Sequence, residues 1–172
     1  SKTNKKLNLQ LDFTEYKRYI GLPFKNILSN MRIKKNLSLI EKTYNNYAKK
    51  NKVVYINKKT KVDLMKLKRN YKMAIFTSKN KKRTNLILKE FKIFECIVCP
   101  EDIKRGKPFP DGITKILKKT HVNKKSVLYI GDSYYDWLAA KNAKINYRHA
   151  EWGYDKSLLK NNKIKKLKKL SD

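Results

Sequence analysis

The sequence contains few residues that interrupt regular structure and few acidic ones. Its 172 residues include 5 glycines, 4 prolines and 2 cysteines, and 14 Asp and Glu stand beside 44 Lys and Arg. So few cysteines exclude the small secreted domains that disulfides hold together. No apolar stretch approaches the roughly 18 residues of a membrane span, and no secretory signal is visible. We therefore expect a soluble, cytoplasmic protein with no membrane partner.

The positive charge is large but spread along the whole chain. The formal net charge is +30, and of the 44 basic residues 38 are lysine and six are arginine. Proteins that bind nucleic acids gather charge on one face and favour the bidentate arginine side chain. The dispersed lysine favours a compositional bias, so we expect no specific nucleic-acid partner. A basic nucleic-acid-associated protein is the last-ranked alternative, and Lys156–Lys169 is expected to be a helix with a solvated lysine face.

Cys96 and Cys99 form a Cys-x-x-Cys pattern within an apolar run. A zinc site would need further ligands, and His121 and His149 are distant from this pair and from each other in the sequence. We therefore predict two buried free thiols, which suit a reducing compartment.

The first sixty residues differ in pattern from the rest. Apolar and polar side chains alternate across Lys6–Thr14, which predicts a strand. Helical spacing then predicts one helix that begins at Pro23 and another over Ser38–Lys50, with Ser38 available as its cap.

From Val62 onward, helical and strand patterns alternate. Such a succession predicts a parallel sheet covered by helices on both faces, because parallel strands need crossover connections. The expected helices cover 62–71, 80–91, 110–120 and 133–143, with a basic helix after 155, and the expected strands cover 73–77, 95–99, 126–130 and 145–149.

An acidic segment follows the predicted strand 126–130. Gly131 allows a tight turn, and Asp132 and Asp136 come next, the second of them one turn into the following helix. Open α/β sheets bind ligands at the carboxyl ends of their strands, and Mg2+ prefers carboxylate oxygens. Asp132 is therefore a candidate metal ligand, although an aspartate in such a place can equally cap the helix.

Two further segments supply groups of a different kind. Thr77 and Ser78 end an apolar strand, and Lys107 stands in a rigid Gly-Lys-Pro-x-Pro setting. A hydroxyl, a lysine and the carboxylates of Asp132 and Asp136, in this order, resemble motifs two, three and four of the haloacid dehalogenase (HAD) superfamily of phosphohydrolases. The detailed spelling is most similar to the phosphoglycolate phosphatase-like branch.

The resemblance implies a role for each of these side chains. Thr77 and Ser78 would bind the phosphoryl group, and Lys107 would neutralise both that group and the attacking carboxylate. Asp132 would ligate Mg2+ directly. Asp136 would either ligate it through water or orient Lys107, so Lys107, Asp132 and Asp136 are the candidate catalytic residues and the two aspartates the candidate metal ligands.

The superfamily's first motif, Asp-x-Asp-x-Thr, is missing, because no Asp-x-Asp occurs in the chain. Its first Asp attacks phosphorus to give an aspartyl-phosphate, and its second acts as acid and base. The nearest match, at 10–14, has Gln10 at the nucleophile's position. Because Gly21 follows this match closely, we interpret it as accidental and expect the nucleophile upstream of Ser1, in agreement with a first residue other than Met.

The resemblance also implies an architecture. It is an α/β fold with a Rossmann-like parallel sheet core over 61–172 and a small helical cap over 1–60. The motif-one strand would lie in the middle of the sheet, between the strands 73–77 and 126–130. Either Lys6–Thr14 or a preceding segment must fill that place, because a gap would leave backbone groups unpaired on both sides.

These observations predict a magnesium-dependent phosphatase that acts on a small phosphorylated metabolite and resembles phosphoglycolate phosphatase. Without its nucleophile, the chain as printed would have little or no turnover. The main alternative is a catalytically inactive relative that binds phosphate or metal, with Gln10 in the nucleophile's place.

Overall fold

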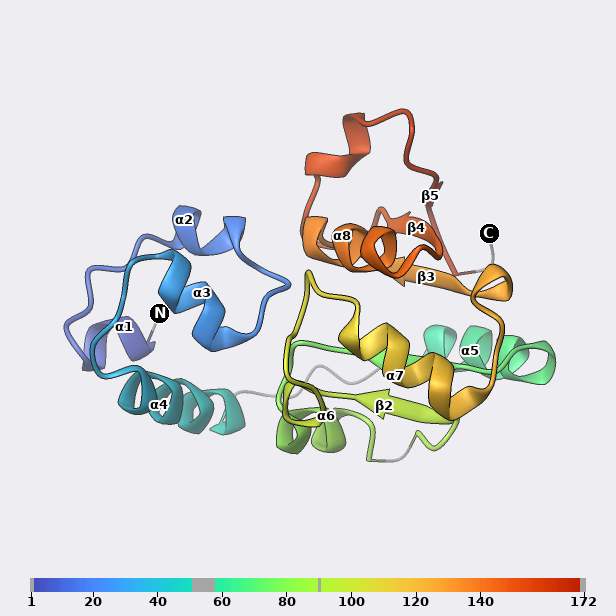
Figure 1. The fold of residues 1–172 in the computed structure, drawn as a ribbon. Helices are drawn as coiled ribbons and strands as arrows, with labels where there is room; N and C mark the ends of the chain where they lie inside the picture. The colour runs from blue at the N-terminus through green and yellow to red at the C-terminus, as the bar shows by residue number, and fades with distance from the viewer. Residues whose placement is uncertain (1, 51–57, 90, 171–172) are drawn as a thin grey trace.

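A computed structural model describes residues 2–50, 58–89 and 91–170 of the chain (Figure 1). Its elements form two lobes, one made of helices alone and one that holds the described strands. The helical lobe comprises α1 (Lys2–Lys6), α2 (Phe13–Arg18), α3 (Phe24–Asn30) and α4 (Leu37–Lys50).

Two helices of this lobe were predicted. Helix α3 starts directly after Pro23, as expected. Helix α4 covers the predicted Ser38–Lys50 but begins one residue earlier, so Ser38 lies in its first turn and not at its cap. The buried side chains of the lobe include the cluster Leu22, Ile27 and Met31.

The predicted strand over Lys6–Thr14 is wrong. The segment between α1 and α2 has no strand partner among the described residues, and its backbone bonds to the backbone of α1 and to the Asn4 side chain instead. The Asn4 side chain both donates to Leu11 O and accepts from Leu11 N, each at 3.2 Å. The carboxylate of Asp12 caps α2 by accepting from two backbone N–H groups of its first turn. Alternating polarity therefore reflects an irregular segment packed on one side.

The strands form two parallel sheets, where the sequence predicts a single one. Each of the four predicted strands is present, within two residues at either end, so the α/β class is confirmed. In the described part of the chain, β1 (Ala74–Phe76) pairs with β2 (Cys96–Val98), and β4 (Asn146–Ala150) lies between β3 (Leu128–Gly131) and β5 (Lys166–Leu167).

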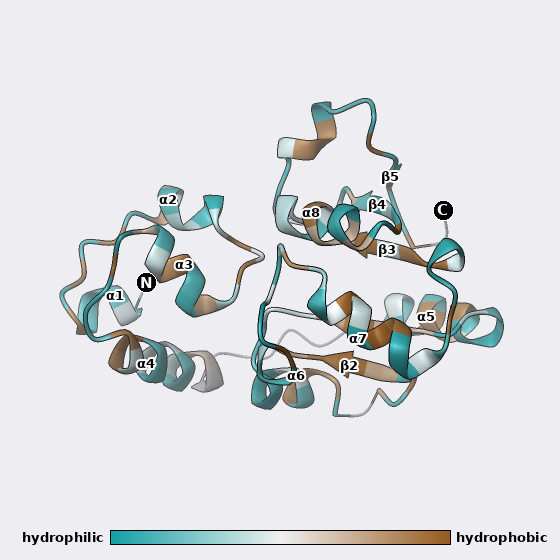
Figure 2. Ribbon diagram, viewed as in Figure 1, coloured by the Kyte–Doolittle hydropathy of each residue, from teal (hydrophilic) through white to brown (hydrophobic). Residues whose placement is uncertain are grey.

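One hydrophobic core joins both sheets. Phe76 and Val98 of the first sheet pack with Ile113 and Ala139, and Tyr129 of β3 packs against the same cluster. Figure 2 shows the hydrophobic residues along β2, β3 and α7. No helix within the described ranges is long and apolar enough to cross a membrane. The helices of this lobe are α5 (Lys58–Asn70), α6 (Lys81–Ile87), α7 (Asp111–Thr120) and α8 (Tyr134–Ala143).

The split between the sheets leaves apolar surface uncovered. Strands β1 and β3 belong to different sheets, and the Tyr129 hydroxyl oxygen lies 3.4 Å from Phe76 O across the split. Leu128 and Ile130 of β3 are 48% and 39% exposed. Helix α5 buries none of its residues. Parallel sheets are normally covered on both faces, so β3, at the edge of its sheet, is incompletely covered here.

The predicted basic helix after residue 155 is also wrong. The segment forms a 3₁₀ turn, η3 (Ser157–Lys160), followed by β5, which pairs with β4. Its apolar side chains Leu158, Ile164 and Leu167 are buried. Their contacts with the second sheet therefore decide the conformation, and helical propensity does not.

Cys96 lies in β2, and Cys99 follows that strand. Both thiols are free and buried, as predicted. Burial raises the pKa of the Cys99 thiol. A buried thiol with a raised pKa is a poor nucleophile, which agrees with a packing role.

Replacing Gly112 by alanine is expected to destabilise the fold, although alanine favours helices. An added Cβ would lie 2.3 Å from the buried ring of Phe76. Forcing this contact apart should cost about 1–3 kcal/mol of unfolding free energy. Thr114→Ala, an exposed position of the same helix, is the matched control and should change stability by no more than about 0.5 kcal/mol. Urea unfolding of both variants measures the difference, and equal stabilities would contradict the close packing of α7 on β1.

Candidate active site

A buried ion pair stands at the centre of the candidate site. The Nζ of Lys107 lies 2.5 Å from Oδ1 of Asp136, and the two residues are only 7% and 4% exposed. The ammonium also lies 5.0 Å from the ring centroid of Phe76 and 5.8 Å from that of Tyr129. Lys107 therefore reaches between β1 and β3, at the split between the two sheets.

The backbone around Lys107 is held on both sides. The peptide bond from Lys107 to Pro108 is cis, and the Asn142 side chain of α8 donates to Pro108 O at 2.9 Å. Arg105 forms two hydrogen bonds with Asp111, at 2.9 and 3.2 Å. The loop before α7 is thus fixed, and it aims a single ammonium into the interior.

The carboxylate of Asp136 accepts four hydrogen bonds. Lys107 and the Tyr129 hydroxyl, at 2.8 Å, donate to Oδ1, while the backbone N–H and the hydroxyl of Ser133 donate to Oδ2 at 3.1 and 2.6 Å. Ser133 also caps α8 by accepting from Asp136 N. Because both oxygens are occupied by protein donors, Asp136 serves as the fixed partner of Lys107.

Electrostatics in this cluster favour one set of protonation states. Burial raises the pKa of Asp136, but the Lys107 charge and the hydrogen bonds from Lys107, Ser133 and Tyr129 outweigh it and hold this pKa below its ordinary value. Burial and the Asp136 charge raise the pKa of Tyr129 well above its ordinary value. Tyr129 is therefore a neutral donor to an ionised carboxylate.

Asp132 begins the turn between β3 and α8. One oxygen, Oδ2, accepts a hydrogen bond of 3.2 Å from Tyr154 N. The turn needs two close approaches, because a Cβ on Gly131 would lie 2.4 Å from Asp136 Cβ and a Cβ on Gly153 would lie 2.0 Å from Asp132 Cβ. Asp132 therefore lies in a tightly packed turn, and its carboxylate accepts fewer protein hydrogen bonds than that of Asp136.

The two predicted hydroxyls have different surroundings. Thr77 Oγ1 accepts from Lys79 N at 3.1 Å, which leaves its own proton for another acceptor. Ser78 Oγ instead donates to Gly21 O at 2.5 Å. Thr77 is thus the better placed donor for a phosphoryl group, and Ser78 ties the sheet lobe to the helical lobe.

A turn of the helical lobe covers this part of the sheet lobe. Gly21 has φ +110, and an added Cβ would lie 2.5 Å from Ser133 Oγ. Pro23 packs on Gly106, where a Cβ would lie 2.6 Å from its ring. The Gly-Leu-Pro turn therefore contacts the segments that carry the ion pair, as a cap would.

Sequence reasoning missed two participants. Tyr129 and Ser133 donate hydrogen bonds to the Asp136 carboxylate, and neither residue was predicted to take part in the site. The Ser-x-x-Asp spacing at 133–136 matches a capping box and could have identified Ser133. The tyrosine within the apolar strand gave no such signal, because its hydroxyl reaches Asp136 only once α8 packs beside β3.

The donors present suit Mg2+ only in part. Mg2+ keeps several waters and uses one or two carboxylates together with substrate phosphates. Within the described ranges, no three His, Cys, Asp or Glu side chains gather as a metal cluster. Asp132 fits as one anchoring carboxylate, and further ligands would have to come from water, substrate or residues beyond this set.

The hydrogen bonds of Asp136 predict how stability depends on pH. A carboxyl whose folded pKa lies below its unfolded value of 3.8 stabilises the fold at higher pH and loses that effect as pH falls through the folded value. The unfolding free energy should therefore decrease as pH falls below about 4. Urea unfolding between neutral and acidic pH should show a shallower acid limb in Asp136→Asn than in the native chain. Parallel acid limbs would contradict the assignment.

Comparison with known proteins places the chain in a family. The profile of the haloacid dehalogenase-like hydrolase family matches residues 2–150. The candidate pyrophosphatase PpaX of Caldanaerobacter subterraneus is 31% identical over 154 residues, which cover 86% of this chain and 70% of that protein. Phosphoglycolate phosphatase 1 of Pseudomonas aeruginosa is 32% identical over 99 residues, 55% of this chain and 36% of the relative.

Solved structures share the fold. A hydrolase from Pseudomonas syringae has a TM-score of 0.76 and 26% identity, covering 90% of this chain and 76% of that one. CbbY from Rhodobacter sphaeroides, solved in complex with xylulose-(1,5)bisphosphate, has a TM-score of 0.81 and 16% identity, covering 99% and 85%.

The chain belongs to the haloacid dehalogenase-like hydrolase family. Within that family it is a hydrolase of the phosphatase type, and the resemblance predicted from the motifs is confirmed.

Proposed function

We propose that this protein hydrolyses a small phosphate monoester with the help of Mg2+. The observation that carries the proposal is the buried Lys107–Asp136 pair beside Asp132. Holding an ammonium in the interior costs free energy that an apolar pair would not, so the arrangement suits chemistry better than stability. A preorganised cation next to a carboxylate turn is what a phosphoryl group needs.

Each side chain has a role in this proposal. Asp132 would anchor Mg2+, which supplies charge neutralisation at the phosphoryl oxygens. Lys107 would bind the same oxygens, and Thr77 would donate its hydroxyl proton to one of them. Asp136 would orient Lys107, because its four hydrogen bonds leave little room for a metal. Ser78 would hold the Gly21 turn of the helical lobe against the site through its hydrogen bond to Gly21 O.

The nucleophile is proposed to be an aspartate on a strand that lies between β1 and β3. Each sheet consists of parallel strands, and the two sheets share one core. They are nevertheless separate at the place where the Lys107 ammonium lies. One strand inserted there would occupy roughly 10 Å, or two strand spacings. It would also cover Leu128 and Ile130. Residues 7–12 lie between α1 and α2, away from this place, so an upstream segment is the proposed source.

Two observations support a small phosphorylated metabolite as the substrate: the contact between the two lobes and the names of the relatives. We assign residues 1–60 as the cap and 61–172 as the core, since the Gly21 turn of the helical lobe lies against Ser78 and Ser133. A cap that lies against the site would favour a small substrate. The relatives are named for pyrophosphate and phosphoglycolate, which are both small phosphorylated compounds. The predicted cytoplasmic location stays a prediction.

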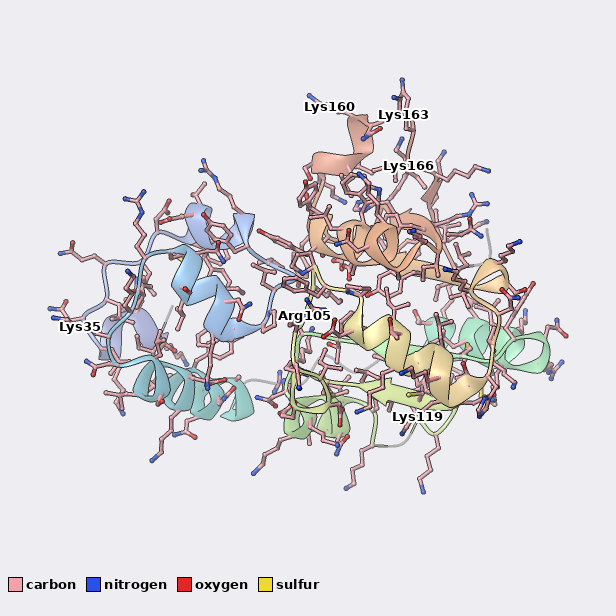
Figure 3. All side chains as sticks on the ribbon, in the orientation of Figure 1. Lys35, Arg105, Lys119, Lys160, Lys163 and Lys166 are labelled. Atoms are coloured by element: carbon pink, nitrogen blue, oxygen red, sulfur yellow. The ribbon has the colours of Figure 1, made fainter. Side chains whose placement is uncertain are left out.

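Two other functions are less well supported. An inactive binder with Gln10 at the nucleophile's place would need residues 7–13 in the split, and they lie in the helical lobe. A nucleic-acid-binding face would need gathered charge. Figure 3 shows basic side chains projecting in several directions, with Lys35 on the helical lobe, Lys119 on α7 and Lys163 near the carboxyl terminus.

The test is hydrolysis of an aryl phosphate with and without Mg2+. The printed chain is compared with the full product of its gene. We expect Mg2+-dependent turnover in the full product and none in the printed chain, because only the former would supply the nucleophile. Turnover by the printed chain, or turnover that ignores Mg2+, would overturn the proposal.

A further inference from the structure

His149 is completely buried in β4 and has no part in the site described above. Its exposure is 0%, and it lies opposite Gly131 in the pairing of β3 with β4. Both ring nitrogens have partners. Nε2 lies 2.9 Å from Asp155 O, and Nδ1 lies 3.1 Å from the hydroxyl oxygen of Tyr147. The imidazole therefore bridges Tyr147 and the loop that contains Asp155.

The chemistry of the partner fixes the direction of the bond to Asp155. A carbonyl oxygen only accepts, so Nε2 of His149 carries a proton and donates it to Asp155 O. The Tyr147 hydroxyl donates to Gly131 O at 2.9 Å. Burial and the Asp136 charge raise the pKa of Tyr147, so this hydroxyl keeps its proton. Tyr147 and His149 of β4 thus each hold one carbonyl oxygen. Tyr147 holds that of Gly131, which precedes Asp132, and His149 holds that of Asp155, in the loop after β4.

The held segments themselves contact Asp132. Asp155 N donates to Asp132 O at 3.3 Å, and Tyr154 N donates to Asp132 Oδ2 at 3.2 Å. The carboxylate of Asp155 also accepts from Tyr134 N, at the start of α8, at 2.8 Å. The loop from Glu151 to Asp155 is therefore fastened over the β3–α8 turn.

We propose that His149 and Tyr147 are positioning residues that lock this loop and thereby fix the Asp132 carboxylate for cation binding. The inference rests on the proposed function of Asp132. An apolar side chain would fill the same volume but would leave Asp155 O without the donor that the buried imidazole supplies, which costs free energy. Partners of this kind behind a metal ligand typically change metal affinity by about 10–100-fold.

The experiment uses the full gene product and three variants. His149→Leu removes both bonds, His149→Gln keeps an amide donor that can reach Asp155 O, and Tyr147→Phe removes the bond to Gly131 O. Mg2+ affinity is measured by calorimetry, and amide hydrogen exchange is followed at Tyr154 and Asp155. We expect His149→Leu to weaken Mg2+ binding by about 10–100-fold and to accelerate exchange at both amides. His149→Gln should restore most of both, and Tyr147→Phe should fall between them.

Two results would overturn the inference. One is unchanged exchange and affinity in His149→Leu. The other is acceleration that spreads equally to the amides of β1 and α7, because that would show a general core defect. The exchange measurement needs no metal. A full product that binds no Mg2+ would therefore defeat the proposed function, while the exchange rates would still decide whether His149 locks the loop.

Discussion

In the full gene product, Lys107→Met is expected to abolish turnover. It should also lower the free energy of unfolding by about 3–5 kcal/mol, the usual cost of leaving a buried charge unpaired. Methionine keeps much of the apolar stem that passes the rings of Phe76 and Tyr129. It removes the cation that Asp136 holds at 2.5 Å. Most domains have only about 5–15 kcal/mol to lose, so the effect should be plain in urea unfolding.

The control for Lys107→Met is the double variant with Asp136→Asn. Asparagine can still accept from Tyr129 and carries no charge, so the double variant should regain most of the lost stability and none of the activity. Asp136→Asn alone provides a second measurement if Lys107→Met does not fold. A loss below about 1 kcal/mol in Lys107→Met would contradict the ion pair's role as a buried charge pair.

Asp132→Asn should have the opposite profile, with turnover lowered about a hundredfold or more and stability almost unchanged. The reason is that Asp132 makes one 3.2 Å side-chain hydrogen bond, to Tyr154 N, and an asparagine oxygen can accept it equally well. The measurement is kcat at saturating Mg2+, together with Mg2+ affinity by calorimetry.

The matched control for Asp132→Asn is Asp12→Asn, an exposed aspartate of the helical lobe that accepts from Thr14 N and Glu15 N. That variant should retain most of the activity. Full activity in Asp132→Asn, or equal loss in both variants, would contradict the assignment of Asp132 as the metal anchor.

The sheet lobe could be predicted well because its patterns are strong. The run before Gly131, the hydroxyl pair at Thr77 and the Gly-Lys-Pro loop each lie at the end of a strand or in a loop of that lobe, and the structure joins Lys107 to Asp136 as one buried pair. Local sequence does not reveal Tyr129 in the same way, since its hydroxyl meets Asp136 only after β3 and α8 have packed together.

The errors have a common cause in tertiary partners. Lys6–Thr14 has a strand's alternation, but a strand needs a neighbour, and the Asn4 side chain takes that place. The segment after residue 155 has a helix's composition, but Leu158, Ile164 and Leu167 are drawn into the second sheet. The sheet was expected to be single, and we attribute its split to the proposed middle strand, which the described residues do not supply.

The proposed phosphatase activity depends most on the segment that lies between β1 and β3 in the full gene product. An experimental structure of that product is therefore the most direct test. We predict a parallel strand that is hydrogen-bonded to both β1 and β3 and ends in an aspartate within hydrogen-bonding reach of Lys107. A structure in which the split is empty, or is filled by a segment without a carboxylate beside Lys107, would contradict the proposed phosphatase.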